Sequence, residues 1–599
     1  MRTLNYGLIG NCRSAALVSD KGAIEWFCLP KFDSPSIFAK ILDEKIGGEF
    51  AILTSEDYKI SQQYMKRTNL LLTRFDNGTD AFEITDFMPR YMNGDNDYYA
   101  PPDVIRYFRV LSGKPKFRIN YNPKMNYALG ETNSVIRSKY IKSITTQGDY
   151  DSAYMYSSFD FHSILNSKEI LLSKDEYILL SYHQKLHSPT IERSCLKLER
   201  TKVYWLNWAD RTQKYSQYND EILRSALVLK LLTYNPSGAI LAAVTTSLPE
   251  TIGEERNWDY RFCWMRDASM TIKVLSNLGH LNVARRYLNY ILKLVPVKDE
   301  PIQIMYGING EKKLSEKHLD YLDGYEGSKP VRIGNAAYKQ KQNDIYGVLV
   351  DVIYQLFKRF DVSLSNSEEL WTVTRSMMKV VQHTWRNPDR GIWEIRNEQK
   401  HFTFSKLLCW VAMDRGAKIA NMINMPDYVE QWSVLRDEIK QDIMENAWNE
   451  SVGAFTQTYA SKELDASNLL MQTYGFISAD DPKFQSTVHA TEKALSRDGL
   501  MYRYKNTDDF GAPKSSFTIC TFWLITALYR IGEKARAKAM FERVLSYSNH
   551  LGLFSEDIDF ETKALLGNFP QAYSHLALIE TAITISEDKT NGLNKEKLC

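Results

Sequence analysis

The chain has 599 residues, of which 44% are hydrophobic and 25% charged, an ordinary composition for a globular protein. Its formal net charge is only +2 and no long basic or acidic run is present, which argues against a nucleic-acid partner or a lipid surface. No stretch approaches the roughly 18 consecutive apolar residues of a membrane span, and the first residues lack a signal-peptide pattern. We therefore expect a soluble, cytoplasmic protein.

Residues 1–215 are predicted to form mainly β-structure, because many short apolar runs are separated by turn signals. The clearest runs are 15–18, 107–111, 117–121 and 170–172, and the clearest turns are 76–78 and 113–115. Frequent turns between short strands favour a β-sandwich over a parallel sheet. Residues Trp205–Asn219 are expected to connect this domain to the next one, which would begin at about residue 222.

From residue 222 to residue 590 the apolar spacing becomes helical. The predicted helices are Ile222–Tyr234, Asp267–Leu278, Val283–Val295, Asp344–Phe360, Glu368–Trp385, His401–Ile423, Tyr428–Trp448, Ala466–Ile477, Phe484–Leu495, Phe517–Ile531, Lys534–Tyr547 and Gln571–Ile585. An even set of antiparallel helices around a closed core is an α/α toroid, which carries its site on the loops at one end. Residues 591–599 belong to a polar tail that we expect to be frayed.

Glu394 lies on a predicted loop directly after Trp393, between the turn residues Asn387–Gly391 and the predicted helix His401–Ile423. A carboxyl group packed against an aromatic ring is costly to ionise, so its pKa rises. A general acid that works near neutral pH needs such a pKa. The competing interpretation is a solvated glutamate beside an anchoring ring, so Glu394 alone does not define a site.

The stretch Asn257–Asp267 ends at the start of a predicted helix and contains Arg266 and Asp267 close to Trp264. Such a pair offers donors and an acceptor to two vicinal hydroxyls of a sugar ring, and the indole offers a wall. The alternative interpretation is that Asp267 is a helix N-cap.

Two more loops flank predicted helices. In Gly327–Ala336, Lys329 or Arg332 could face a pocket, although exposed loop cations are usually only solvated. In Gly552–Asp559, Glu556 is the natural partner for Glu394. Two carboxyl groups on opposite sides of a pocket, one protonated and one ionised, are the groups that hydrolyse a glycosidic bond.

Together these stretches resemble glycoside hydrolase family 15, the glucoamylase and trehalase family. The matching segments read NWDYRFCWMRDA, SKPVRIGNAA, GIWEIR with KHFTFSK and CWVAMDR, and LFSEDID with GNFPQAYSH. The resemblance begins at Asn5–Asn11 and covers essentially the whole chain. It implies an N-terminal β-supersandwich followed by an (α/α)6 barrel, a six-hairpin toroid.

By this resemblance, Glu394 is the general acid and Glu556 the general base of a single-step, inverting hydrolysis. The two carboxyl groups are then expected roughly 6.5–9.5 Å apart, which leaves room for the attacking water. Because this chemistry needs only two carboxyl groups and water, no cofactor and no metal is implied. The seven cysteines also give no indication of a metal site, because no pair has metal-ligand or redox spacing.

The resemblance also implies which residues bind the substrate. Arg266 and Asp267 would hold the terminal glucose, and Tyr260 would lie near the base and the scissile bond. The full set of expected substrate contacts is Tyr260, Trp264, Arg266, Asp267, Lys329, Arg332 and Trp393. Two segments depart from the family pattern: Lys329 stands where many relatives carry arginine, and Lys514–Phe517, expected in a loop near the barrel mouth, replaces a more usual Glu-Gly-Ala-Phe. Both could change which glucoside is accepted.

We expect an exo-acting, inverting α-glucoside hydrolase of the glucoamylase type, which releases β-glucose from the non-reducing end of α-glucans or malto-oligosaccharides. The alternative is a trehalase that hydrolyses α,α-trehalose, and isomaltose or dextran also remain open. A glycoside phosphorylase is disfavoured because Glu556 occupies the position of the base. A non-catalytic glucan-binding protein is disfavoured because both carboxyl groups are present. The only partner implied is the α-glucoside, and the sequence does not indicate an oligomeric state.

Overall fold

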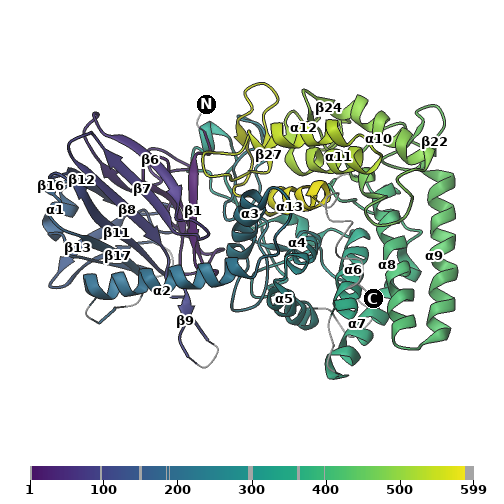
Figure 1. Ribbon diagram of the computed structural model, residues 1–599, viewed down its shortest axis with the longest axis horizontal. Helices are drawn as coiled ribbons and strands as arrows, with labels where there is room; N and C mark the ends of the chain where they lie inside the picture. Colours follow the sequence, from purple (N-terminus) through teal and green to yellow (C-terminus); the bar gives the residue numbers. More distant parts are fainter. Residues whose placement is uncertain are drawn as a thin grey trace.

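The computed structural model describes residues 3–94, 97–147, 151–183, 185–187, 189–294, 301–359, 364–396 and 398–586. Figure 1 shows a β-domain, coloured purple to blue, beside a larger helical domain coloured teal to yellow. Within the ranges just given, no helix is long and apolar enough to cross a lipid bilayer. The predicted polar tail 591–599 lies outside the described residues.

The β-domain is built from two antiparallel sheets. The seven-stranded sheet consists of β1 (Tyr6–Gly10), β2 (Ala15–Ser19), β3 (Ile24–Cys28), β4 (Ser36–Phe38), β5 (Glu49–Leu53), β12 (Lys116–Asn122) and β16 (Ile170–Leu171). The eight-stranded sheet consists of β6 (Lys59–Tyr64), β7 (Leu71–Asp76), β8 (Ala81–Phe87), β11 (Asp103–Ser112), β13 (Thr132–Arg137), β14 (Tyr140–Thr145), β15 (Ser152–Ser157) and β17 (Glu176–Tyr182). The predicted runs at 15–18, 107–111 and 117–121 fall on strands, and the run at 170–172 overlaps β16. Both predicted turns separate strands that are consecutive in the chain.

A row of phenylalanine rings joins the two sheets. Phe75 stacks on Phe82 with ring centroids 4.6 Å apart, and Phe82 lies 5.1 Å from Phe117. Phe117 belongs to the seven-stranded sheet and also stacks on Phe108 at 5.5 Å. Large aromatic side chains that alternate inward along β-strands bury much apolar area, and they form the core of the sandwich.

One long helix lies in the region predicted to be mainly β. Helix α2 (Ile191–Asp210) contacts β9 (Tyr91–Met92), β11 and β17, and it runs along one side of the β-domain toward the helical domain (Figure 1). Its buried face includes Leu198, Trp205 and Trp208, and Thr190 caps its N-terminus. The connection expected to begin at Trp205 therefore begins only after Asp210, and the proposed domain boundary falls between α2 and α3.

The helical domain is a closed double ring. Its elements are α3 (Asn219–Leu231), α4 (Met265–Asn277), α5 (Leu281–Leu294), α6 (Asp344–Arg359), α7 (Leu364–Thr384), α8 (Thr403–Met422), α9 (Pro426–Asn446), η3 (Ala466–Leu470), α10 (Pro482–Leu495), α11 (Thr518–Arg530), α12 (Lys534–Leu545) and α13 (Ala572–Ser586). Consecutive contacts α4–α6–α8–η3–α11–α13–α4 close the inner ring, and the other helices lie outside it. Helices α4, α8, α11 and α13 are buried on nearly all sides, as the inner position requires.

The predicted helix Ala466–Ile477 is wrong, because only the 3-10 turn η3 forms there. The carboxylate of Asp465 accepts the backbone N–H of Ser467, and the side-chain amide of Asn468 donates to the carbonyls of Phe455 and Thr456. Side chains that bond the backbone in this way compete with helical hydrogen bonds. One inner position of the ring is therefore filled by a short turn.

Candidate active site

Glu394 and Glu556 line one cavity in the helical domain. The cavity measures about 90 Å³. The residues around it include Glu250, Arg256, Trp258, Tyr260, Trp264, Arg266, Asp267, Trp393, Arg396, Arg503, Asp508, Phe510, Gln571 and Tyr573. Five of the seven predicted substrate contacts are thus brought together, from segments that are far apart in the chain.

Glu394 ends a tight turn that begins at Gly391 and precedes α8. Its φ is +61°, in the left-handed region, which aims its side chain differently from that of a helical or extended residue. The indole Nε1–H of Trp264 donates to Oε1 of Glu394 at 2.7 Å, and Nη2 of Arg266 lies 3.7 Å from the same oxygen. Burial raises the pKa of Glu394, and Arg266 and Trp264 partly offset that rise.

The aromatic partner of Glu394 is therefore Trp264, although the sequence suggested Trp393. The indole of Trp393 donates to Oδ2 of Asp465 at 2.8 Å and packs against Phe517 with ring centroids 5.5 Å apart. Trp393 still lines the cavity, where it forms part of the apolar wall.

Glu556 is almost fully buried, with 2% of its surface exposed. The hydroxyl of Tyr260 donates to its Oε1 at 2.6 Å, whereas none of the described residues forms a hydrogen bond with its Oε2. Burial and the nearby negative charge of Glu250 raise the pKa of Glu556, while Tyr260 and Arg503 act in the opposite direction. Gly567, with φ +75°, packs directly against this side chain.

The segment that departs from the family pattern forms the frame behind Glu556. Strand β26 (Ser516–Phe517) pairs with β27 (Asp557–Ile558), which directly follows Glu556. The hydroxyl of Ser515 donates to Oδ1 of Asp557 at 3.0 Å. Lys514 points away and pairs with Glu254. The serines of this departure therefore help to hold the loop that carries Glu556.

Arg266 and Asp267 lie in the first turn of α4, inside the cavity. Helix α4 begins at Met265, so the interpretation of Asp267 as an N-cap is wrong. Nε of Arg266 donates to the hydroxyl of Tyr573 at 2.5 Å, and Nη1 donates to Oδ2 of Asp344 at 3.3 Å, which fixes the guanidinium. Oδ1 of Asp267 lies 3.5 Å from Nε of Arg266 but has no hydrogen-bond partner among the described residues, and burial raises the pKa of this carboxyl to about 6. It is an acceptor available to a hydroxyl in the cavity.

A buried pair that the sequence interpretation missed borders Glu556. Both carboxylate oxygens of Glu250 accept hydrogen bonds from Arg503, at 3.3 and 2.8 Å, and both residues line the cavity. The two positions are 253 residues apart and neither stands in a recognisable motif. No local signal could have found them, because only the closure of the helical ring brings them together.

Comparisons with known proteins identify the family. The model described as Glycosyl hydrolases family 15 matches residues 216–583, and the model described as Trehalase-like, N-terminal matches residues 4–149. The chain belongs to glycosyl hydrolase family 15. It is therefore a glycoside hydrolase, as the motifs predicted.

Similar proteins span nearly the full length of this family 15 hydrolase. It is 37% identical over 593 residues to the Trehalase of Thermoplasma volcanium, covering 97% of this chain and 93% of that protein. It is 35% identical over 617 residues to the Trehalase of Mycobacterium tuberculosis, covering 97% and 89%. A bacterial glucoamylase complexed with acarbose has the same fold, with a TM-score of 0.69, 14% identity and coverage of 98% and 95%. The predicted β-sandwich followed by a helical barrel is confirmed.

In this family 15 hydrolase the two predicted loop cations do not reach the cavity. Lys329 has a side chain that is 54% exposed, and its ammonium lies 3.8 Å from Asp323. Arg332 is buried, and its Nη1 donates to the backbone carbonyls of Glu255 and Asn257 at 2.7 and 2.9 Å. Neither residue is among the side chains that line the cavity.

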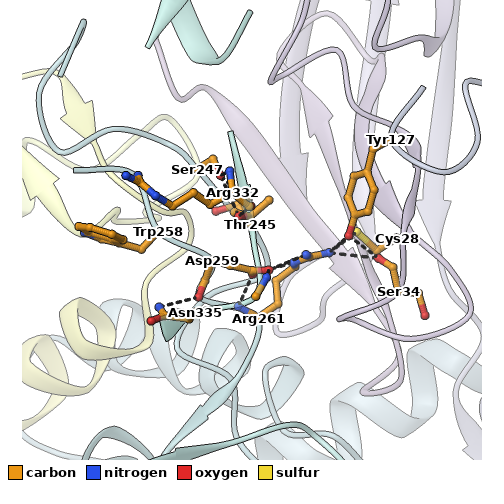
Figure 2. A network of polar contacts seen from close by, with 12 residues as sticks. Cys28, Ser34, Tyr127, Thr245, Ser247, Trp258, Asp259, Arg261, Arg332 and Asn335 are labelled. Carbon is orange, nitrogen blue, oxygen red and sulfur yellow. Dashed lines mark hydrogen bonds and ion pairs between the residues drawn. The ribbon is translucent and has the colours of Figure 1, made fainter. Parts of the chain in front are cut away.

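Arg332 instead supports Trp258, which does line the cavity. Figure 2 shows Arg332 near Trp258. The Arg332 guanidinium lies 4.4 Å from the centre of the Trp258 ring, and that of Arg396 lies 4.6 Å from the same ring. Phe510 packs edge-on to Trp258 at 5.1 Å. Arg256 closes this wall by donating to Oδ1 of Asp508 at 2.5 Å. The wall combines an aromatic face with charged groups that can bind hydroxyls.

A buried ion pair ties the cavity to the β-domain (Figure 2). Nη2 of Arg261 donates to Oδ2 of Asp259 at 2.7 Å, and its Nη1 donates to the hydroxyl of Tyr127 at 2.7 Å and to the carbonyl of Ser34 at 3.1 Å. Trp26, also from the β-domain, donates to the carbonyl of Val244 at 2.8 Å. The segment that carries Tyr260 is therefore anchored by the neighbouring domain.

Proposed function

We propose that this glycoside hydrolase is a trehalase, which hydrolyses α,α-trehalose with inversion. The observation that carries the proposal is one buried cavity that holds two carboxyl groups, each with one oxygen fixed by an aromatic donor. Arg266 and Asp267 line the same cavity, and among the described residues Oδ1 of Asp267 has no hydrogen-bond partner. The names of the full-length relatives support trehalose as the substrate.

The first glucose unit is bound by Arg266 and Asp267. Because Tyr573 and Asp344 already hold the guanidinium of Arg266, its remaining N–H groups are fixed before substrate arrives. Asp267 accepts from a sugar hydroxyl through Oδ1, which relieves the cost of a buried polar atom without a partner. Recognition of this kind orients the anomeric carbon between Glu394 and Glu556.

Glu394 then gives a proton to the glycosidic oxygen, and the bond from that oxygen to the anomeric carbon breaks. Glu556 takes a proton from a water molecule, whose oxygen attacks the same carbon from the opposite face. The attacked glucose leaves with inverted configuration, as the β-anomer. The other glucose keeps its own anomeric centre and leaves as the α-anomer.

The division of roles between the two carboxyl groups stays a prediction, supported by the motif around each residue. Burial raises the pKa of both carboxyl groups, which favours the protonated form of each relative to a glutamate in water. Oε1 is occupied by a donor in both side chains. In both side chains this leaves Oε2 for proton transfer.

The cavity favours a disaccharide over a polymer. Its volume of about 90 Å³ lies below the roughly 300 Å³ of ordinary small-molecule sites, so the covering side chains must move for any sugar to enter. Trp258, Phe510 and the Arg256–Asp508 pair form one wall of this cavity. A second glucose can bind to its charged groups, whereas a longer chain would run into it.

The test is glucose release from trehalose, maltose, isomaltose, maltoheptaose and soluble starch, with the anomers followed by proton NMR. Trehalose should be the preferred substrate, and it should give equal amounts of α- and β-glucose before mutarotation. Two equivalents of α-glucose would contradict inversion. Faster hydrolysis of starch or maltoheptaose than of trehalose would indicate a glucoamylase instead.

A second readout of the same reaction distinguishes a hydrolase from a phosphorylase. The proposal expects glucose release in phosphate-free buffer and no glucose 1-phosphate when phosphate is added. Formation of glucose 1-phosphate would mean that phosphate, and not a water activated by Glu556, attacks the anomeric carbon.

A further inference from the structure

A second cavity, much larger than the first, lies where the two domains meet. It measures about 740 Å³ and is bounded by α2, by the strands β9 and β10 (Tyr98–Tyr99), by the end of α3 and by the start of α5. It shares no lining residue with the catalytic cavity. We call it the junction cavity.

The junction cavity is strongly cationic. Among the described residues, its lining includes five basic residues, Arg90, Arg200, Arg211, Lys230 and Arg286, and one acidic residue, Glu199. Glu199 pairs with Lys202 at 3.3 Å. Among the described residues, none of the five basic side chains forms an ion pair with a carboxylate. Such a concentration of one charge attracts anions.

Two of these cations are buried. Lys230 is 8% exposed, and its ammonium donates to the hydroxyl of Thr233 at 3.2 Å. Arg90 is 1% exposed, and its guanidinium donates to the carbonyl of Asn11 and to Oδ1 of Asn235, both at 2.9 Å. Its Nε has no hydrogen-bond partner in the described part of the chain. Buried charges without a counter-charge are costly. Burial, with Arg90 nearby, lowers the pKa of Lys230 to about 8, a cost that a bound anion would relieve.

Aromatic faces line the same space. Tyr98 and Tyr204 lie 4.5 and 4.9 Å from the guanidinium of Arg90. Trp208 stacks on His280 with ring centroids 3.8 Å apart. These residues supply flat apolar surface beside the cations, and a volume of about 740 Å³ is far more than a lone phosphate ion would fill. The lining therefore matches a ligand that has both a ring and a negative charge.

We propose that the junction cavity binds a small phosphorylated ring compound, with its phosphate on the basic residues and its ring against the aromatic faces. A sugar phosphate and a nucleoside phosphate both have this chemistry. Arginine suits the phosphate because its planar N–H groups match two phosphate oxygens at once. The site is separate from catalysis, so trehalose does not compete for it.

The test is isothermal titration calorimetry of the full-length protein, at constant ionic strength, with glucose 6-phosphate, AMP and inorganic phosphate. At least one of the two ring compounds should bind. If glucose 6-phosphate binds more tightly, the ligand class is a sugar phosphate, and if AMP binds more tightly, it is a nucleoside phosphate. Saturating trehalose should not change the affinity. Binding by neither ring compound, binding no tighter than that of inorganic phosphate, or displacement by trehalose would overturn the proposal.

Two adjacent arginines of α5 provide a matched pair of variants. Arg286 lines the junction cavity, whereas Arg285, which is also exposed, does not. Arg286→Gln should weaken binding about tenfold, and Arg285→Gln should leave it within about twofold, since only the first loses a charged contact. Equal effects of both substitutions would show attraction by surface charge alone and would overturn the site. Arg211→Gln is a second, independent variant with the same expectation as Arg286→Gln. Unchanged glucose release by each variant verifies its folding.

Discussion

Tyr260 donates a hydrogen bond of 2.6 Å to Oε1 of Glu556, although the two residues are 296 positions apart. Four residues after Tyr260, Trp264 donates to Oε1 of Glu394 at 2.7 Å. One short segment thus supplies a donor to each of the two carboxyl groups. Arg261, between these donors, anchors the segment to the β-domain. The geometry of both carboxyl groups therefore depends on this single segment.

The roles of the two carboxyl groups can be separated with α-glucosyl fluoride, whose leaving group needs no proton. Glu394→Gln and Glu556→Gln should each lower kcat on trehalose by about 10²–10⁴-fold, as expected for general acid and base groups. Glu394→Gln should retain most fluoride hydrolysis, whereas Glu556→Gln should lose it. The reverse pattern would exchange the two roles.

Removal of each aromatic donor should shift a different limb of the pH profile of kcat/KM. Each donor favours the ionised carboxylate, so its removal raises the pKa of its partner. Tyr260→Phe should therefore move the acidic limb, which reports ionisation of the base, to higher pH. Trp264→Phe should move the alkaline limb, which reports loss of the acid's proton, to higher pH. Shifts on the same limb would contradict the assignment.

Gly567 should be essential for the position of Glu556. A Cβ at this position would lie 2.8 Å from Oε2 of Glu556, and φ is +75°. Gly475 has φ +78° but nothing within 4 Å of the same position, so Gly475→Ala is the matched control. Both alanine variants should lose about 1–2 kcal/mol of unfolding free energy. Only Gly567→Ala should lose activity, by about 100-fold, as judged from kcat on trehalose.

The buried Arg261–Asp259 ion pair should contribute strongly to the free energy of unfolding. Arg261→Met leaves the buried carboxylate of Asp259 unpaired and should cost about 3–5 kcal/mol in urea unfolding. Adding Asp259→Asn should recover part of that loss, because the uncompensated charge disappears. A cost below about 1 kcal/mol for Arg261→Met would mean that water enters and relieves the pair.

Much of the fold could be predicted because its signal is local. The helix Thr403–Met422 and the strand Lys116–Asn122 both follow from apolar spacing over a few turns or residues. The exception at Ala466–Ile477 arose where Asp465 and Asn468 bond the backbone with their side chains. The apolar residues there have helical spacing, but these side-chain hydrogen bonds favour a short 3-10 turn over a regular helix.

The sequence by itself determined the order of the two domains, the family and the two candidate catalytic carboxyl groups, because contiguous stretches of the chain carry the patterns that identify them. Only the tertiary structure decided which side chains meet them. It placed Glu250 and Arg503 beside Glu556, and it left Lys329 in solvent. The physical reason is that burial, charge partners and pKa depend on distances across the closed ring of helices. Those distances join residues hundreds of positions apart, and no local pattern encodes them.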